Sequence, residues 1–225
     1  MKANLPSKTE YLKILVHATC ALQVFLLLAG CASIQVAGDV ERGRRALLIG
    51  HPEVALNDFQ RAAQQDPRYR YNNSILRQGV WTYVGRAYYD LGKFSEARQS
   101  LEKAQSLYKN DYLADLYLGL ALAKEDNRQR ALQQITAGLR GLRNWLDWVQ
   151  QYDPDGWLWD PGGDLRSEIN KDLEMISGRE FSWNELISSG EWLGKKFEEE
   201  IDLVRRDQFR EQQRDSDDSR DDGGH

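Results

Sequence analysis

The sequence predicts an all-α protein in which three helix pairs form a short right-handed solenoid, followed by a tryptophan-rich helical cap. Three observations carry this prediction. A pattern of small residues recurs three times in the middle of the chain, with a glycine and an alanine 12 residues apart in each copy. A long stretch of helical periodicity follows the third copy. A capping box then precedes an amphipathic run near the C-terminus.

The first 30 residues have the layout of a secretory signal. Three lysines lie within residues 1–13, and an apolar run extends from Ile14 to Leu28. A positive start followed by a hydrophobic stretch is typical of such signals. No charged residue occurs from Ile14 to Gly38, which is also long enough to span a bilayer as a helix. Polar residues interrupt this stretch, so we predict a cleaved signal and keep an uncleaved anchor helix as the alternative.

The cleavage site is predicted by the string LAGC, which ends at Cys31. This string resembles the lipobox of bacterial lipoprotein precursors, whose cysteine thiol receives a diacylglyceryl group and becomes the first residue after cleavage. The resemblance implies a signal peptide over residues 1–30, an acylated Cys31 and a tether over residues 31–38. Several acyl chains, palmitate among them, hold a protein stably where one chain is reversible. Ala32 after the cysteine favours the periplasmic face of the outer membrane.

Composition limits the class of function. The chain has 225 residues, and an apolar share of 41% is enough for a packed core. Removal of residues 1–30 leaves 27 basic and 34 acidic residues, and so a net charge of −7. Broad nucleic-acid binding needs an excess of Lys and Arg on one face, so we predict no nucleic-acid partner. No zinc-type Cys/His spacing is present, and we predict neither a metal site nor a cofactor.

The repeated unit is clearest in WTYVGRAYYDLGKFSEARQSLEKA, residues 81–104. Its small residues recur 34 residues later, and the same internal spacing occurs once upstream. The small residues of the three units are Gly43, Ala55 and Ala62; Gly85, Ala97 and Ala104; and Gly119, Ala131 and Gly138. Small side chains at this spacing let two antiparallel helices approach closely, while larger side chains fill the space between units.

This pattern resembles the tetratricopeptide repeat, and the resemblance covers residues 39–150. The sequence departs from the family at Asp115, where the preceding unit has Trp81, and at Lys109, which replaces a proline. Eight extra residues separate the first two units. Because Ser74 and the two asparagines before it offer N-caps, we expect these residues to lengthen the next helix, which would begin near Ile75.

The resemblance implies a concave face, lined by the first helix of each pair, that binds an extended peptide or a partner helix. In our register the partner-binding side chains are Arg44, Thr82, Tyr83, Arg86, Tyr89, Tyr117 and Lys124. Tyrosine and arginine are good interface anchors because each combines a large contact area with a polar end. The carboxylate clamp of the co-chaperone members is absent, so chaperone-tail binding is not implied. The alternative is that the C-terminal helix folds back and fills this face.

Residues 151–204 are predicted to be a tryptophan-rich helical segment that caps the open end of the solenoid. Six of the seven tryptophans lie between Trp145 and Trp192. The segment begins with YDPDGWLWDPGGD, whose prolines and glycines predict a loop. Alternatively, Trp157 and Trp159 in this loop stack on sugar rings and bind peptidoglycan or another glycan. A calcium loop is disfavoured, because tryptophan and leucine occupy positions that need an oxygen ligand and a glycine.

A capping box formed by Ser182 and Glu185 predicts the start of a long amphipathic helix. Within this helix, the acidic run at residues 198–200 is interpreted as a solvated face. Residues 205–225 are too polar to be buried, so we expect a frayed helix end followed by a disordered tail.

Catalysis has little support in the sequence. After cleavage only His51 and His225 would remain, and His51 precedes Pro52 in a tight turn between helices. No nucleophile elbow, metal-pair motif or phosphate loop is present. We therefore predict that the chain is not an enzyme but a lipid-anchored periplasmic scaffold, which binds another envelope protein for assembly, secretion, pilus formation or control of a cell-wall hydrolase. A glycan-binding lipoprotein is the alternative.

Overall fold

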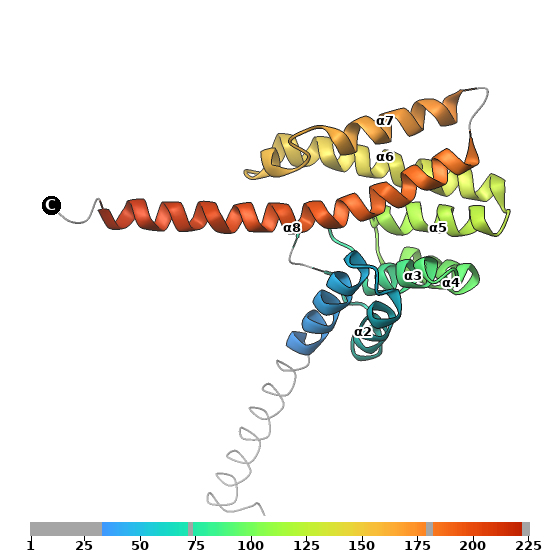
Figure 1. Cartoon of the computed structure of the whole chain (residues 1–225), viewed down its shortest axis with the longest axis horizontal. Helices are drawn as coiled ribbons and strands as arrows, with labels where there is room; N and C mark the ends of the chain where they lie inside the picture. Colours follow the sequence, from blue (N-terminus) through green and yellow to red (C-terminus); the bar gives the residue numbers. More distant parts are fainter. Residues whose placement is uncertain (1–32, 72–73, 179–181, 222–225) are drawn as a thin grey trace, which may run out of the picture.

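The computed structural model describes residues 33–71, 74–178 and 182–221. The predicted signal peptide and the acylated Cys31 therefore lie outside the described residues. The described residues form helices and their connections, together with one isolated antiparallel bridge between Arg70 and Gly79. The helices pack as successive pairs, and the last helix runs across them (Figure 1). The prediction of an all-α fold is confirmed.

Three helix pairs follow one another along the chain. They are the helix described over residues 33–48 with α2 (Pro52–Gln65), α3 (Val80–Asp90) with α4 (Phe94–Leu107), and α5 (Tyr112–Lys124) with α6 (Arg128–Tyr152). A short 3-10 helix η1 (Gly156–Leu158), α7 (Asp164–Ser177) and α8 (Trp183–Asp221) complete the fold. Each pair packs on the next, α2 against α3 and α4 against α5. No helix in the described part of the chain is both long and apolar enough to cross a membrane.

The three pairs are equivalent in detail, because the turn inside each pair has the same backbone hydrogen bonds. One amide in each turn donates to the carbonyl five residues earlier: His51 to Ala46 at 2.8 Å, Lys93 to Tyr88 at 2.9 Å and Asn127 to Leu122 at 2.9 Å. The preceding residue is left-handed in each case, with φ of 80° at Gly50, 71° at Gly92 and 60° at Asp126. Glycine and aspartate tolerate this conformation, which ends a helix and turns the chain back.

The small residues predicted to lie between the helices do so in the structure. A Cβ on the glycine of the first helix would lie 2.4–2.5 Å from a large side chain 16 residues later: Gly43 from Phe59, Gly85 from Leu101 and Gly119 from Ile135. The three alanines of the repeat pattern that follow the turns, at residues 55, 97 and 131, are completely buried. The register inferred from the sequence is therefore confirmed, since any side chain at these glycines would force the paired helices apart.

The eight extra residues between the first two pairs do not lengthen α3. The prediction of a helix beginning near Ile75 is wrong, because α3 begins at Val80. The chain instead forms a loop closed by a hydrogen bond from the Tyr71 amide to the Gln78 carbonyl, at 2.8 Å. Gly79 ends the loop in an extended conformation and serves as the N-cap of α3. The loop delivers the side chains of Tyr71 and Gln78 to the interior, where both are completely buried.

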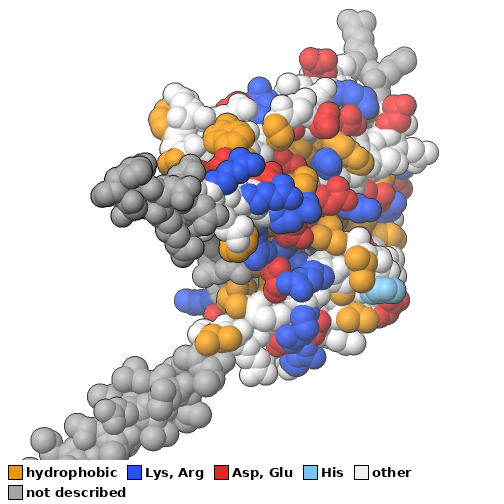
Figure 2. Space-filling model, turned by 60° about the vertical axis from the view of Figure 1, so that its left-hand side comes forward, with side chains coloured by type: hydrophobic (Ala, Val, Ile, Leu, Met, Phe, Trp, Pro, Cys, Tyr) orange, Lys and Arg blue, Asp and Glu red, His pale blue; other side chains and the backbone are white. Residues whose placement is uncertain are grey.

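The C-terminal helix α8 folds back over the repeats and then extends beyond the other helices (Figure 1). It packs on α5 and α7, and the amide of Glu185 donates to the Ser182 hydroxyl at 3.3 Å, as the capping box predicts. The helix continues past residue 205, where the sequence predicts a tail, to Asp221. Polar contacts explain part of this extension, because Gln208 donates to Asp155 at 2.7 Å. Figure 2, turned to bring this side of the molecule forward, shows acidic and basic side chains interspersed on the surface.

Candidate functional site

The face formed by the first helices of the three pairs is occupied by α8. Six of the seven predicted partner-binding residues are buried, namely Arg44, Thr82, Tyr83, Arg86, Tyr89 and Tyr117. Lys124 alone stays at the rim, with 34% of its side chain exposed. The C-terminal helix therefore folds back onto this face, which is the alternative considered from the sequence. A partner segment could lie along the whole of this face only if α8 moved away.

The covered residues have different neighbours. Tyr83 stacks on Phe59 with ring centroids 5.1 Å apart, and Thr82 donates to the buried Asp111 at 2.6 Å. Both contacts lie within the repeats. The remaining four contact α8 directly: Arg44, Arg86, Tyr89 and Tyr117. These four predicted binding residues thus hold this protein's own C-terminal helix.

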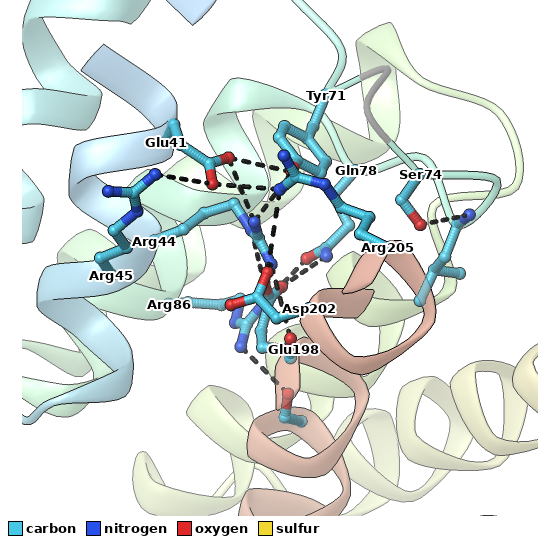
Figure 3. A network of polar contacts seen from close by, with 12 residues as sticks. Glu41, Arg44, Arg45, Tyr71, Ser74, Gln78, Arg86, Glu198, Asp202 and Arg205 are labelled. Carbon is cyan, nitrogen blue, oxygen red and sulfur yellow. Dashed lines mark hydrogen bonds and ion pairs between the residues drawn. The ribbon is translucent and has the colours of Figure 1, made fainter. Parts of the chain in front are cut away.

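Glu198 is the centre of this contact (Figure 3). Its side chain is 2% exposed, and its carboxylate accepts hydrogen bonds from Arg44 Nε at 2.8 Å and Gln78 Nε2 at 2.5 Å. It also pairs with Arg86. Each arginine directly follows the small glycine of its own repeat unit. The two arginines therefore occupy equivalent positions in the first two units, and both side chains reach Glu198. A single carboxylate on α8 therefore joins the first two units.

A second group of polar side chains surrounds Glu198 (Figure 3). Arg44 also donates to the Tyr71 hydroxyl at 2.9 Å and to Asp202 at 3.2 Å, and its guanidinium lies 4.5 Å from the Tyr71 ring centroid. The Tyr71 hydroxyl donates to Glu41 at 2.9 Å. Arg205 donates to Glu41 at 3.1 Å and to the Tyr71 hydroxyl at 2.8 Å. This group connects α8 to the first helix and to the loop before α3.

The electrostatics of Glu198 favour the docked position of α8. Burial by itself raises the pKa of this carboxyl, but the neighbouring Arg44 and Arg86 outweigh burial and lower the pKa to about 2. For each arginine, burial by itself lowers the pKa, because it also disfavours the charged form. Nearby groups that include Glu198 outweigh burial and raise the pKa of both arginines above the usual value. All three groups are therefore charged at neutral pH. Departure of α8 would separate Glu198 from both guanidinium groups and break the contacts that they share.

The sequence interpretation of residues 198–200 as a solvated face is wrong for two of the three glutamates. Glu198 and Glu200 are 2% and 5% exposed, whereas the Glu199 side chain is 42% exposed. The sequence carries a signal for this burial. Glu198 lies next to Phe197 and one turn from Ile201 in the apolar stripe, so it faces the buried side of the helix.

Two glycines let α8 approach α5 closely. A Cβ on Gly194 would lie 2.2 Å from the Tyr117 hydroxyl oxygen, and a Cβ on Gly190 would lie 2.9 Å from Leu120. The two glycines are four residues apart and so share one face of the helix. Close approach also exposes the Gly194 carbonyl to Arg86, which donates to it at 3.1 Å.

A cavity of about 420 Å³ remains where α8 leaves part of this face uncovered, and we call it the groove cavity. Four predicted partner-binding residues line it: Arg86, Tyr89, Tyr117 and Lys124. Its apolar wall comes from Leu47, Leu48 and Phe94. The rest of the rim is charged, with Asp90, Glu191 and Lys195.

The groove cavity has an aromatic wall beside a charged rim. Lys124 Nζ lies 3.3 Å from Glu191 and within 6.0 Å of the ring centroids of Tyr89 and Phe94. The Tyr89 hydroxyl donates to Glu191 at 2.5 Å. Such a site offers contact area to an apolar side chain and ion pairs to the polypeptide around it. It is suited to binding a protein segment.

The structure separates the two tryptophans of the alternative glycan site. Trp159 is 2% exposed and packs edge-on against Trp145, with ring centroids 4.8 Å apart. Burial prevents Trp159 from stacking on a sugar ring, so the two indoles do not form a glycan site together. Trp157 is 60% exposed. Among the described residues, no group of three His, Cys, Asp or Glu side chains is placed to hold a metal ion.

Comparison with known families identifies the middle helix pair. Residues 79–111 match the family model described as Tetratricopeptide repeat, a range that contains α3 and α4. A comparison with curated proteins gives no match to this sequence. Repeats of this kind present extended surfaces to other proteins. The chain is therefore an all-helical protein that contains a tetratricopeptide repeat and is suited to interaction with protein partners.

Proposed function

We propose that this chain is a lipid-anchored adaptor of the bacterial envelope, which binds another envelope protein at the groove cavity. The LAGC string supports acylation at Cys31, and the first described helix already includes residue 33, so the repeats would lie close to the membrane surface. The match to the tetratricopeptide repeat supports a protein partner. Assembly, secretion, pilus formation and control of a cell-wall hydrolase are processes that use such adaptors.

The observation that carries this proposal is the position of the groove cavity. It lies on the face where the family resemblance implies binding, and four of the seven predicted partner-binding residues line it. A volume of about 420 Å³ is in the range of sites for small ligands. The partner would therefore insert one or two side chains of an extended segment rather than a whole helix.

Site-specific photo-crosslinking in envelopes tests this proposal. A photoreactive amino acid at Lys195, on the rim of the groove cavity, is expected to give a discrete adduct with a partner protein. The matched control is the same amino acid at Lys171 on α7, because both lysine side chains are 63% exposed. Adducts of equal yield at the two positions, or none at Lys195, would contradict binding at the groove cavity.

A further variant separates the anchor from the binding site. With Cys31→Ser, the protein is expected to leave the membrane fraction, and the adduct at Lys195 is expected to decrease because the partner is an envelope protein. Retention of an uncleaved form in the membrane would instead support the anchor helix. Membrane retention in this variant tests the anchor alone, since the groove cavity is built entirely from described residues of the body.

A further inference from the structure

We propose that the chain has a second binding site, which takes an acidic peptide segment carrying an aromatic or aliphatic side chain. The site is a cleft of about 460 Å³ between the loop before α3, the start of α5 and the second half of α6. We call it the basic cleft. It shares no lining residue with the groove cavity, so this proposal does not depend on the function proposed above.

Three cations line the basic cleft, Arg70, Arg77 and Lys109, and none of the described lining residues is a carboxylate. This is a local exception in a chain whose net charge is −5. Arg70 has a structural role, because it donates to the backbone carbonyls of Arg77 at 3.4 Å and Lys109 at 3.3 Å. The side chains of Arg77 and Lys109 are exposed, and neither forms an ion pair with a described carboxylate.

Asp111, two residues after Lys109, is the acidic residue that the sequence places beside this cluster. It is buried, and it accepts hydrogen bonds from the Gly79 amide at 2.7 Å and the Thr82 hydroxyl at 2.6 Å. It also accepts from the Ala114 amide as the N-cap of α5. Its oxygens accept from these donors inside the fold and not from Arg77 or Lys109, whose side chains are exposed to solvent.

One wall of the basic cleft is aromatic. Trp148 on α6 is 48% exposed, and Tyr152, one turn further, is 63% exposed with its ring centroid 6.2 Å from that of Trp148. Of these two, Trp148 lines the cleft, together with Tyr112 and Trp145, which are partly buried and pack against the core. Large exposed aromatic side chains that border a cleft mark a binding surface, and tryptophan and arginine contribute disproportionately to binding energy.

An acidic peptide with at least one apolar side chain matches the cations, the aromatic wall and the amide side chains of the lining. Its carboxylates would pair with Arg77 and Lys109, and its apolar side chain would pack on Trp148. The amide side chains of Asn110 and Asn144, which also line the cleft, offer hydrogen bonds to a peptide backbone. A neutral glycan would use the aromatic wall and the amides but would leave both cations without partners, so charge complementarity favours the peptide.

Fluorescence polarisation with a labelled synthetic peptide, Asp-Asp-Phe-Glu-Asp-Leu, tests this inference. Saturable binding is expected, and added salt is expected to weaken it. Arg77→Glu, Lys109→Glu and Trp148→Ala are each expected to raise the Kd by about tenfold or more. The controls are Lys93→Glu, an exposed lysine outside the cleft, and Trp192→Ala, whose indole is 42% exposed against 48% for Trp148. Both controls are expected to bind like the unchanged protein.

Two further probes decide between ligand classes. A peptide with Asn and Gln in place of the acidic residues is expected not to bind, and a neutral chitin oligosaccharide is expected not to compete. Absence of binding by the acidic peptide, or equal affinity of Arg77→Glu and the unchanged protein, would overturn the proposal. Competition by the oligosaccharide that depends on Trp148 but not on Arg77 would assign the cleft to a glycan instead. Thermal melts of each variant identify any loss of folding.

Discussion

Replacement of Glu198 by alanine is expected to lower the free energy of unfolding by about 3–5 kcal/mol, the range for loss of one partner from a buried ion pair. The carboxylate is 2% exposed and is shared by Arg44 and Arg86, which are themselves 1% and 2% exposed. Its removal leaves two guanidinium charges in the interior without an anion. Urea unfolding at neutral pH, followed by circular dichroism, measures this effect.

The adjacent glutamate provides the control. Glu199→Ala removes a side chain that is 42% exposed, and it is expected to change stability by no more than about 0.5 kcal/mol.

The pH dependence of stability provides a second test of the Glu198 network. The pKa of Glu198 is lowered from 4.5 to about 2, so its contribution is present above pH 4.5 and is lost as the pH falls toward 2. The difference between the unchanged protein and Glu198→Ala should narrow over this interval, whereas a constant difference would contradict a charged network.

Replacement of Gly194 by valine is expected to cost about 2–3 kcal/mol of stability, because overpacking at a close contact forces the elements apart. A Cβ at this position would lie 2.2 Å from the Tyr117 hydroxyl and 2.5 Å from its ring. The hydroxyl and the ring belong to Tyr117 on α5, so the valine side chain would force α8 away from α5. Faster tryptic cleavage after Lys195 and Lys196, together with a lower urea midpoint, is the expected result.

Gly38 offers a matched substitution. It is also a helical glycine, but only the end of the Arg42 side chain lies within 4 Å of the Cβ it would gain. Gly38→Val should therefore leave both the urea midpoint and the cleavage of α8 unchanged. If Gly194→Val behaves like Gly38→Val, the close approach of α8 to α5 does not occur.

The repeats could be predicted from the sequence because their packing depends on spacings of a few residues. The glycines at 43, 85 and 119 face partners 16 residues later, and the structure has these contacts at all three places. A position that has no room for a side chain is visible in the sequence as a glycine or alanine. The same reasoning placed Arg44 and Arg86 on the inner face, since each directly follows one of these glycines.

The position of α8 was harder to predict from the sequence, because it depends on pairing between residues that are far apart in the chain. Arg44 and Glu198 are separated by 154 positions, and no local pattern connects them. The loop before α3 was missed for a related reason, since its Gln78 side chain is held by Glu198 from the far end of the chain. Trp157 and Trp159 look alike in the sequence, yet the fold exposes one and buries the other.

Zero-length carbodiimide coupling tests most directly whether α8 lies on the repeats. Lys124 Nζ on α5 lies 3.3 Å from the Glu191 carboxylate on α8, and both side chains are accessible to the reagent, at 34% and 41% exposed. Lys171 and Glu168, 3.0 Å apart within α7, form an internal control that does not depend on α8. We expect mass spectrometry to detect both cross-linked pairs in the intact chain. Formation of the Lys171–Glu168 cross-link without the Lys124–Glu191 cross-link would show that α8 does not fill the face formed by the first helices of the three pairs.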